Sequence, residues 1–113
     1  MTEAANAYTT EVTLHDHRIE MEKQLYAGPT NFMVRNKGSM EHNLEVEGQG
    51  IEERFDRNLK PGETRTMQVD LEPGTYEAYC PVDNHEDRGM RTEFNVTGVR
   101  RAAEQAHVHR ETL

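Results

Sequence analysis

A thiol, an imidazole and a thioether follow one another at equal spacing in one short segment of the chain. Cys80, His85 and Met90 carry these groups, and a second imidazole, His42, stands earlier beside a turn signal. Copper suits such a set, because Cu(I) accepts soft sulfur ligands and Cu(II) accepts imidazole nitrogen well. If the protein keeps the four ligands in one geometry that both oxidation states of copper tolerate, few atoms move when an electron is transferred. The four residues therefore predict a site for one copper ion that cycles between Cu(I) and Cu(II).

Two predicted strands place candidate ligands at their ends. Inward residues repeat with a period of two, along His42, Leu44 and Val46 in one strand and along Tyr76, Ala78 and Cys80 in the other. A period of two puts each set on one face of a sheet. His42 therefore begins one inward-facing strand and Cys80 ends another, and a β-sandwich can bring those two ends together.

Short alternating segments separated by turn signals make up most of the chain. This pattern favours an all-β fold, a Greek-key β-sandwich or barrel. The other predicted strands cover 11–21, 31–36, 64–71 and 92–96. A bulge or break is expected near Asp16, where the parity of the apolar residues changes, and Ala27-Gly28-Pro29 indicates a turn. The charged segment Gly48–Lys60 is irregular, and a short helix is one interpretation of it.

A chain of 113 residues suits a single domain. We expect a loose polar N-terminus over 1–10, the β domain over 11–98 and a C-terminal tail over 99–113. Residues of high helix propensity, such as Ala102, Ala103 and Glu104, are frequent in the tail. It is expected either to form a short helix or to remain disordered.

The charge and hydropathy of the chain limit which partners and which cellular compartment it can have. A formal net charge of −8 argues against nucleic acid as the main partner. No stretch has the length and apolarity of a membrane span, and Met1–Thr10 lacks the basic start and apolar centre of a signal peptide.

Cys80 is the only cysteine, so an internal disulfide is excluded. Taken alone, that cysteine is a buried hydrophobe, a nucleophile or a metal ligand.

Three motifs together resemble the cupredoxins, the small blue (type 1) copper proteins. They are Glu41-His42-Asn43-Leu44 after a turn, the strand Gly74–Cys80, and a Cys-x4-His-x4-Met loop. The length of this loop is similar to that of auracyanin and rusticyanin. The resemblance implies a sandwich fold and single-electron transfer between redox partners by a protein that is not an enzyme.

The resemblance also assigns roles by position. It makes His42 and His85 the equatorial nitrogen ligands, Cys80 the thiolate and Met90 the axial thioether. The axial place stays open to another oxygen or sulfur group.

Two residues next to the ligands, Asn43 and Val82, are expected to hydrogen-bond to the site without binding the metal. Asn43 matches the family's asparagine that ties the ligand-bearing loops together, and its backbone N–H can bond the thiolate. Val82 offers a second N–H to the sulfur, because Pro81 has none. Both contacts would disperse thiolate charge and raise the reduction potential.

The residues around His85 depart from the apolar docking patch that is usual in the family. The neighbours Asp83, Asn84, Glu86 and Asp87 make this rim polar and acidic. We therefore expect a redox partner protein that is steered electrostatically and carries a basic docking face. The resemblance further implies a periplasmic or other extracytoplasmic location.

Several alternatives stay open at the level of sequence. A Cys–His pair can serve a thiol enzyme, although no glycine-rich oxyanion loop is evident. A copper centre with catalytic activity, a copper carrier or storage protein, and a zinc site would use similar ligands. The remaining carboxylates Glu45, Glu47, Glu52 and Glu53 are interpreted as a solvated face, and His15 and His17 as surface residues.

Overall fold

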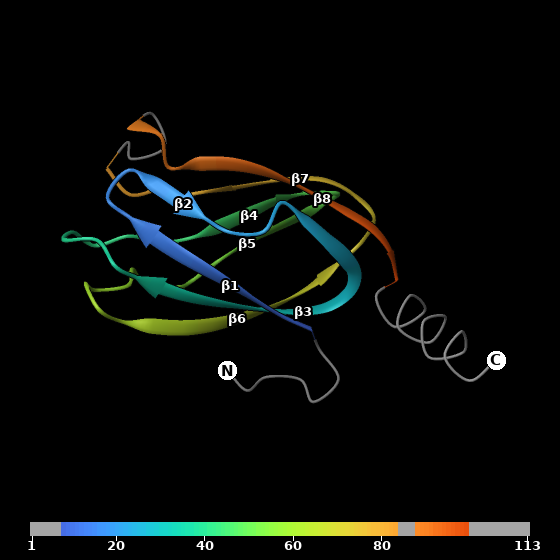
Figure 1. The fold of residues 1–113 in the computed structure, drawn as a ribbon, viewed down its shortest axis with the longest axis horizontal. Helices are drawn as coiled ribbons and strands as arrows, with labels where there is room; N and C mark the ends of the chain where they lie inside the picture. Colours follow the sequence, from blue (N-terminus) through green and yellow to red (C-terminus); the bar gives the residue numbers. More distant parts are fainter. Residues whose placement is uncertain (1–7, 84–87, 100–113) are drawn as a thin grey trace.

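The computed structural model describes residues 8–83 and 88–99, which form eight β-strands (Figure 1). The strands are β1 (Tyr8–His15), β2 (Arg18–Glu20), β3 (Gln24–Asn36), β4 (Glu45–Gly48), β5 (Ile51–Arg54), β6 (Thr64–Leu71), β7 (Gly74–Tyr79) and β8 (Arg91–Val99). No α-helix occurs within these described ranges, so the prediction of an all-β fold is confirmed. Among the same residues there is no helix with the length and apolarity needed to cross a membrane.

Two sheets share strand β3. One has the order β2-β1-β3-β6 and the other the order β3-β8-β7-β4-β5. The β1–β3 and β3–β8 pairs are parallel, and the other pairs are antiparallel. The order of described strands runs from β2 at one edge to β5 at the other without closing, so the molecule is an open sandwich and not a barrel.

Apolar side chains from both sheets meet in one core. The period of two is confirmed along 76–80, where the inward residues are at most 1% exposed and the residues between them are half-buried. It is not confirmed along 42–46, because Asn43 and Glu45 are buried as well. The strand β4 begins only at Glu45, so His42 lies in the loop before it and forms an isolated bridge with Leu59. Phe94 stacks on Tyr76 with ring centroids 5.2 Å apart, and Phe32 of β3 lies 6.1 Å from Phe94. Burial of these large rings stabilises the sandwich at its centre. The strands β7 and β8, which flank Cys80 and Met90, are therefore anchored in the packed centre of the fold.

The prediction of a turn at Ala27-Gly28-Pro29 is wrong. These residues lie inside β3. The pairing of β3 with β8 shifts register between Tyr26 and Ala27 and ends at Ala27, and from Gly28 the strand continues into the sheet containing β6 and β1. Gly28 has φ of +123°, a conformation that favours glycine. Glycine and proline here mark the bend of a strand that changes sheets, and not the end of the strand.

Two other local features are now defined. Of the bulge or break predicted near Asp16, the break is confirmed: β1 ends at His15 and β2 begins at Arg18, and the two form a tight hairpin in which Leu14 pairs with Ile19. The segment Gly48–Lys60 contains the short strand β5 and no helix. Antiparallel pairing with β4 satisfies its backbone, while Phe55 and Leu59 anchor the following loop in the core.

The strand boundaries differ slightly from the predicted domain limits. β1 begins at Tyr8, inside the segment predicted to be loose, because parallel pairing of Tyr8 with Thr30 satisfies its backbone. β8 continues to Val99, which pairs with Ala27. The rest of the predicted loose terminus (1–7) and of the predicted tail (100–113) lies outside the described residues.

Candidate metal centre

His42 is fully buried where the loop after β3 approaches the segment before β6. Its backbone exchanges two hydrogen bonds with Leu59, at 3.1 and 2.7 Å. The loop before it is held by Asn36, whose amide nitrogen donates to the carbonyls of Met40 and Leu59, both at 2.9 Å. The amide oxygen of Asn36 accepts from Gly38 N–H at 2.8 Å. The backbone that carries His42 is therefore fixed on both sides.

Cys80 and Met90 lie side by side at the same end of the sandwich. Cys80 directly follows β7, and Met90 directly precedes β8, so the antiparallel β7–β8 pair brings them together. The backbone N–H of Cys80 donates to the carbonyl of Met90 at 3.0 Å. Both side chains are 0% exposed, which keeps water away from the two sulfur atoms.

The separation of the first two candidate ligands tests whether they fit a metal ion. Sγ of Cys80 lies 3.7 Å from Nδ1 of His42. An ion about 2.0 Å from the nitrogen and about 2.3 Å from the sulfur would see the two atoms about 120° apart at this separation. Trigonal His2Cys ligand sets with a weak axial methionine are typical of blue copper sites. The residues present therefore fit such an ion.

The other ring nitrogen of His42 contacts a residue that the sequence did not single out as functional. Nε2 lies 2.9 Å from Oδ1 of Asp16, in the turn between β1 and β2. The hydroxyl of Ser39, the His42 ring and the Ser39 amide all donate to this carboxylate and hold the pKa of Asp16 well below its usual range. Asp16 is therefore ionised at neutral pH. Asp16 is 26 residues from His42 in sequence, and no spacing rule connects the two.

Asn43 links the cysteine to the segment after β5. Its backbone N–H lies 3.4 Å from Sγ of Cys80, as the resemblance led us to expect. Among the described residues, its side-chain amide nitrogen donates to Phe55 O and Asn58 Oδ1, both at 3.1 Å, and its amide oxygen accepts from Leu44 N–H and Phe55 N–H. Three of these four hydrogen bonds hold the segment after β5 against the metal centre, and the fourth is accepted from the neighbouring residue Leu44. That the side chain ties the two ligand-bearing loops together stays a prediction.

The structure does not test the predicted roles of the two remaining site residues, His85 and Val82. His85 lies outside the described residues, so its role as second equatorial ligand stays a prediction. Val82 is half-buried and packs against the core. Its N–H contact to the sulfur also stays a prediction.

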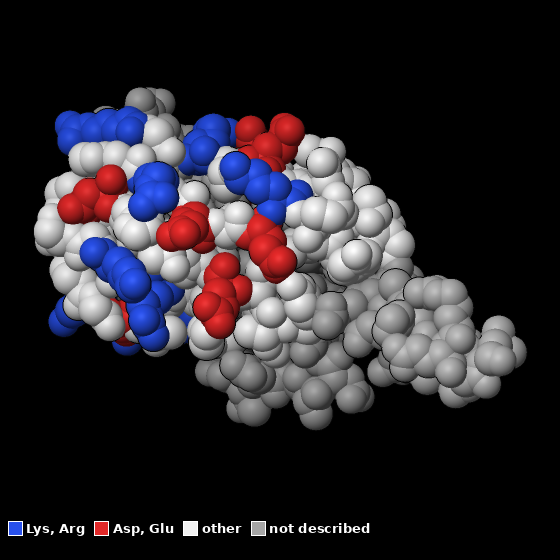
Figure 2. All heavy atoms as spheres, in the orientation of Figure 1, with Lys and Arg blue, Asp and Glu red and all other residues white. Residues whose placement is uncertain are grey.

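The rim of the site, as far as it is described, carries both signs of charge. Glu41, Asp83 and Arg88 are exposed, and Met40 is 37% exposed. Figure 2 shows Lys and Arg side chains interspersed with Asp and Glu side chains on the face drawn there. The acidic net charge is thus not gathered on that face.

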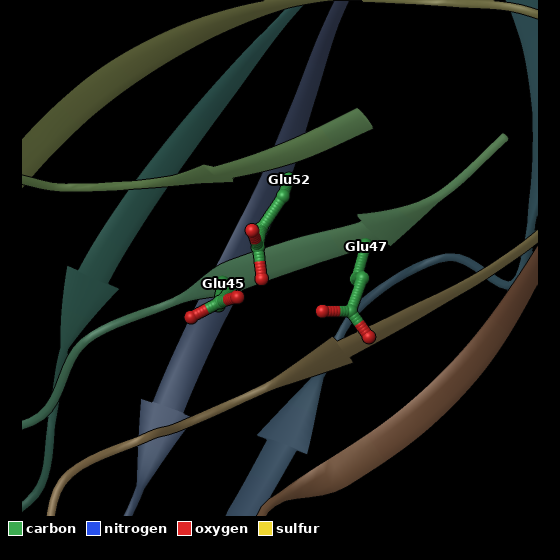
Figure 3. Close-up of side chains that lie close together, drawn as sticks. All are labelled: Glu45, Glu47 and Glu52. Atoms are coloured by element: carbon green, nitrogen blue, oxygen red, sulfur yellow. The ribbon is translucent and has the colours of Figure 1, made fainter. Parts of the chain in front are cut away.

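Three carboxylates gather on the outer surface of β4 and β5 (Figure 3). One oxygen each of Glu45, Glu47 and Glu52 lies within 4.8 Å of the others. Glu45 is buried and lies 3.7 Å from Arg54, whereas Glu47 and Glu52 are exposed. The interpretation of these residues as a solvated face therefore holds for Glu47 and Glu52 but not for Glu45, which is covered and paired with a cation.

Solved structures share this architecture. Auracyanin B superimposes with a TM-score of 0.70 at 18% identity, covering 85% of this chain and 93% of its own. Auracyanin A, a "blue" copper protein of Chloroflexus aurantiacus, gives a TM-score of 0.62 at 17% identity, covering 81% of this chain and 100% of its own. A multi-copper oxidase of Pediococcus acidilactici gives 0.59 at 14% identity, covering 89% of this chain but only 28% of the oxidase. At sequence identities this low, the structural similarity shows that the fold is shared and says nothing more.

Sequence comparison gives the family. No curated protein matches the chain. The family described as the cupredoxin-like domain matches residues 1–92. That match covers well over half of the sequence, and the strand order and the buried Cys80–His42 pair agree with it. The chain belongs to the cupredoxin-like family.

Proposed function

We propose that this protein holds one copper ion between His42, Cys80, His85 and Met90 and carries single electrons between redox partners. The observation that carries the proposal is the 3.7 Å separation of Cys80 Sγ and His42 Nδ1 in a buried position. A bound copper ion would supply the one-electron Cu(I)/Cu(II) couple. The chain's own contribution is to hold soft and hard ligands at nearly fixed positions, because both ligand-bearing segments are anchored to the sheets.

The neighbours of the ligands have separate tasks in this proposal. The N–H of Asn43 donates to the sulfur and disperses thiolate charge, which favours the reduced state. Met90, buried beside Cys80, supports a filled axial position. A filled coordination sphere leaves no place for a substrate, so the arrangement favours an electron carrier over a catalytic copper centre.

Copper titration tests the proposal. Adding one equivalent of Cu(II) to the metal-free protein is expected to give an intense thiolate-to-copper absorption, blue or green in colour, and a reversible one-electron wave in voltammetry. Copper retained through repeated redox cycles distinguishes an electron carrier from a copper carrier. A colourless Cu(II)-loaded protein, or rapid copper loss on reduction, would contradict the proposed function.

We further propose that the redox partner carries a basic docking face and that the protein works outside the cytoplasm. The formal charge of −8 and the exposed Glu41 and Asp83 beside the site support a basic partner. Opposite charges raise association rates at low salt, and screening removes this gain above about 0.1 M.

Salt dependence of electron transfer tests the sign of the docking surface. Oxidation by a small cationic metal complex is expected to slow as ionic strength rises, and oxidation by an anionic complex is expected to accelerate. Stopped-flow absorption of the copper band measures both rates. The opposite trend for the two complexes would show that the electron leaves through a basic surface.

A further inference from the structure

We propose that Asp16, in the β1–β2 turn, is a positioning residue of the metal centre that fixes the ring of His42 and biases the site toward Cu(II). This inference rests on the proposed copper site. It adds a residue from a hairpin that contributes no ligand. It also assigns a role to a carboxylate that neither spacing nor resemblance identified.

The carboxylate of Asp16 is itself held rigidly. The N–H of Ser39 donates to both of its oxygens, at 3.1 and 3.0 Å, and the Ser39 hydroxyl donates to Oδ2 at 2.6 Å. The remaining contact, at 2.9 Å, joins Oδ1 to Nε2 of the fully buried His42. Because an ionised carboxylate only accepts hydrogen bonds, Nε2 must carry the proton. In the neutral ring Nδ1 then has the lone pair that a metal ion needs, 3.7 Å from the sulfur of Cys80.

Two glycines show that the turn packs closely on both ligand-bearing segments. A Cβ at Gly38 would overlap Oδ1 of Asp16 and lie 2.7 Å from Nε2 of His42. A Cβ at Gly89, next to Met90, would lie 2.8 Å from the carbonyl oxygen of His17. The β1–β2 turn therefore forms a wall of the site, and only residues without side chains fit between this wall and the ligands.

A carboxylate behind a ligand imidazole has two effects. It raises the basicity of the ring and holds its orientation, and loss of such a partner typically costs about 10- to 100-fold in metal affinity. Its negative charge stabilises Cu(II) more than Cu(I), because Cu(II) carries the higher charge. Asp16 is therefore expected to lower the reduction potential of the site.

Asp16→Asn tests the charge, because the side chain keeps its size and its acceptor oxygen. Glu20→Gln is the matched control, since Glu20 accepts from His15 Nε2 at 3.0 Å in the same hairpin, on an exposed surface. We expect Asp16→Asn to weaken Cu(II) binding at least tenfold relative to Cu(I) binding. A tenfold change corresponds to a rise of about 59 mV in a one-electron potential. Equal potentials in Asp16→Asn and Glu20→Gln would overturn the inference.

Asp16→Ala tests the tautomer in the metal-free protein. Nitrogen-15 NMR of His42 is expected to show the Nε2–H form alone in the wild type and a mixture of tautomers in Asp16→Ala. An unchanged tautomer would overturn the positioning role. If Asp16→Ala fails to fold, Asp16→Asn provides the same readout, because an amide can donate to Nε2 as well as accept from it and so no longer selects one tautomer. If the wild type gives no copper colour, the proposed function fails, whereas the tautomer experiment still decides the role of Asp16.

Discussion

Replacing Cys80 with serine is expected to abolish the thiolate-to-copper absorption completely. The band requires a sulfur ligand, and Cys80 is the only cysteine in the sequence. A serine hydroxyl is nearly isosteric and can accept the N–H of Asn43, so the fold should survive in this fully buried position. Binding of Cu(II) by the imidazoles alone would leave a pale, weakly held ion, because the soft ligand that suits Cu(I) is lost.

Absorption and electron paramagnetic resonance of copper-titrated Cys80→Ser measure this effect. Met40→Leu is the matched control, since Met40 is a sulfur-containing residue close to His42 in sequence but is 37% exposed. The control should keep the full band. Full colour in Cys80→Ser, or loss of colour in Met40→Leu, would mean that the sulfur ligand has been misassigned.

Replacing Asn43 with alanine is expected to cause the largest loss of stability among single changes near the site. The substitution leaves the N–H groups of Leu44 and Phe55 and the carbonyl of Phe55 without the partner that the amide supplies. Each buried polar group left unpaired costs about 1–3 kcal/mol. We therefore expect the free energy of unfolding of the metal-free protein to fall by about 3 kcal/mol or more.

Urea unfolding of the metal-free protein measures this change without any contribution from copper. Asn95→Ala is the control, because Asn95 lies on the exposed face of β8 and accepts one hydrogen bond, from the Thr75 hydroxyl. It should lose less than about 1 kcal/mol. Equal losses in the two variants would show that Asn43 does not brace the site.

The strand that leads to Cys80 was predictable because its signal is local. A period of two along 76–80 sets which side chains face the core, and burial of apolar groups enforces that choice. The strand at 64–71 was predicted with its bounds for the same reason. The same spacing along 42–46 predicted the burial of His42 but not that it lies in a loop before the strand. The bend of β3 was not predictable, because Gly28 and Pro29 have the same local signature in a turn and in a strand that changes sheets.

The sequence by itself predicted the chemistry that we propose for this protein. The types and spacing of Cys80, His85 and Met90, with His42, indicate a copper site without any structure, because soft and hard ligands in one set serve few other purposes. Only the tertiary structure decided that Asp16 lies against His42 and that Asn43 braces the segment after β5. Both contacts arise from which strands pair and in what register, β1 with β3 for the contact of Asp16 and β4 with β5 for that of Asn43, and the spacing of residue types does not encode this pairing.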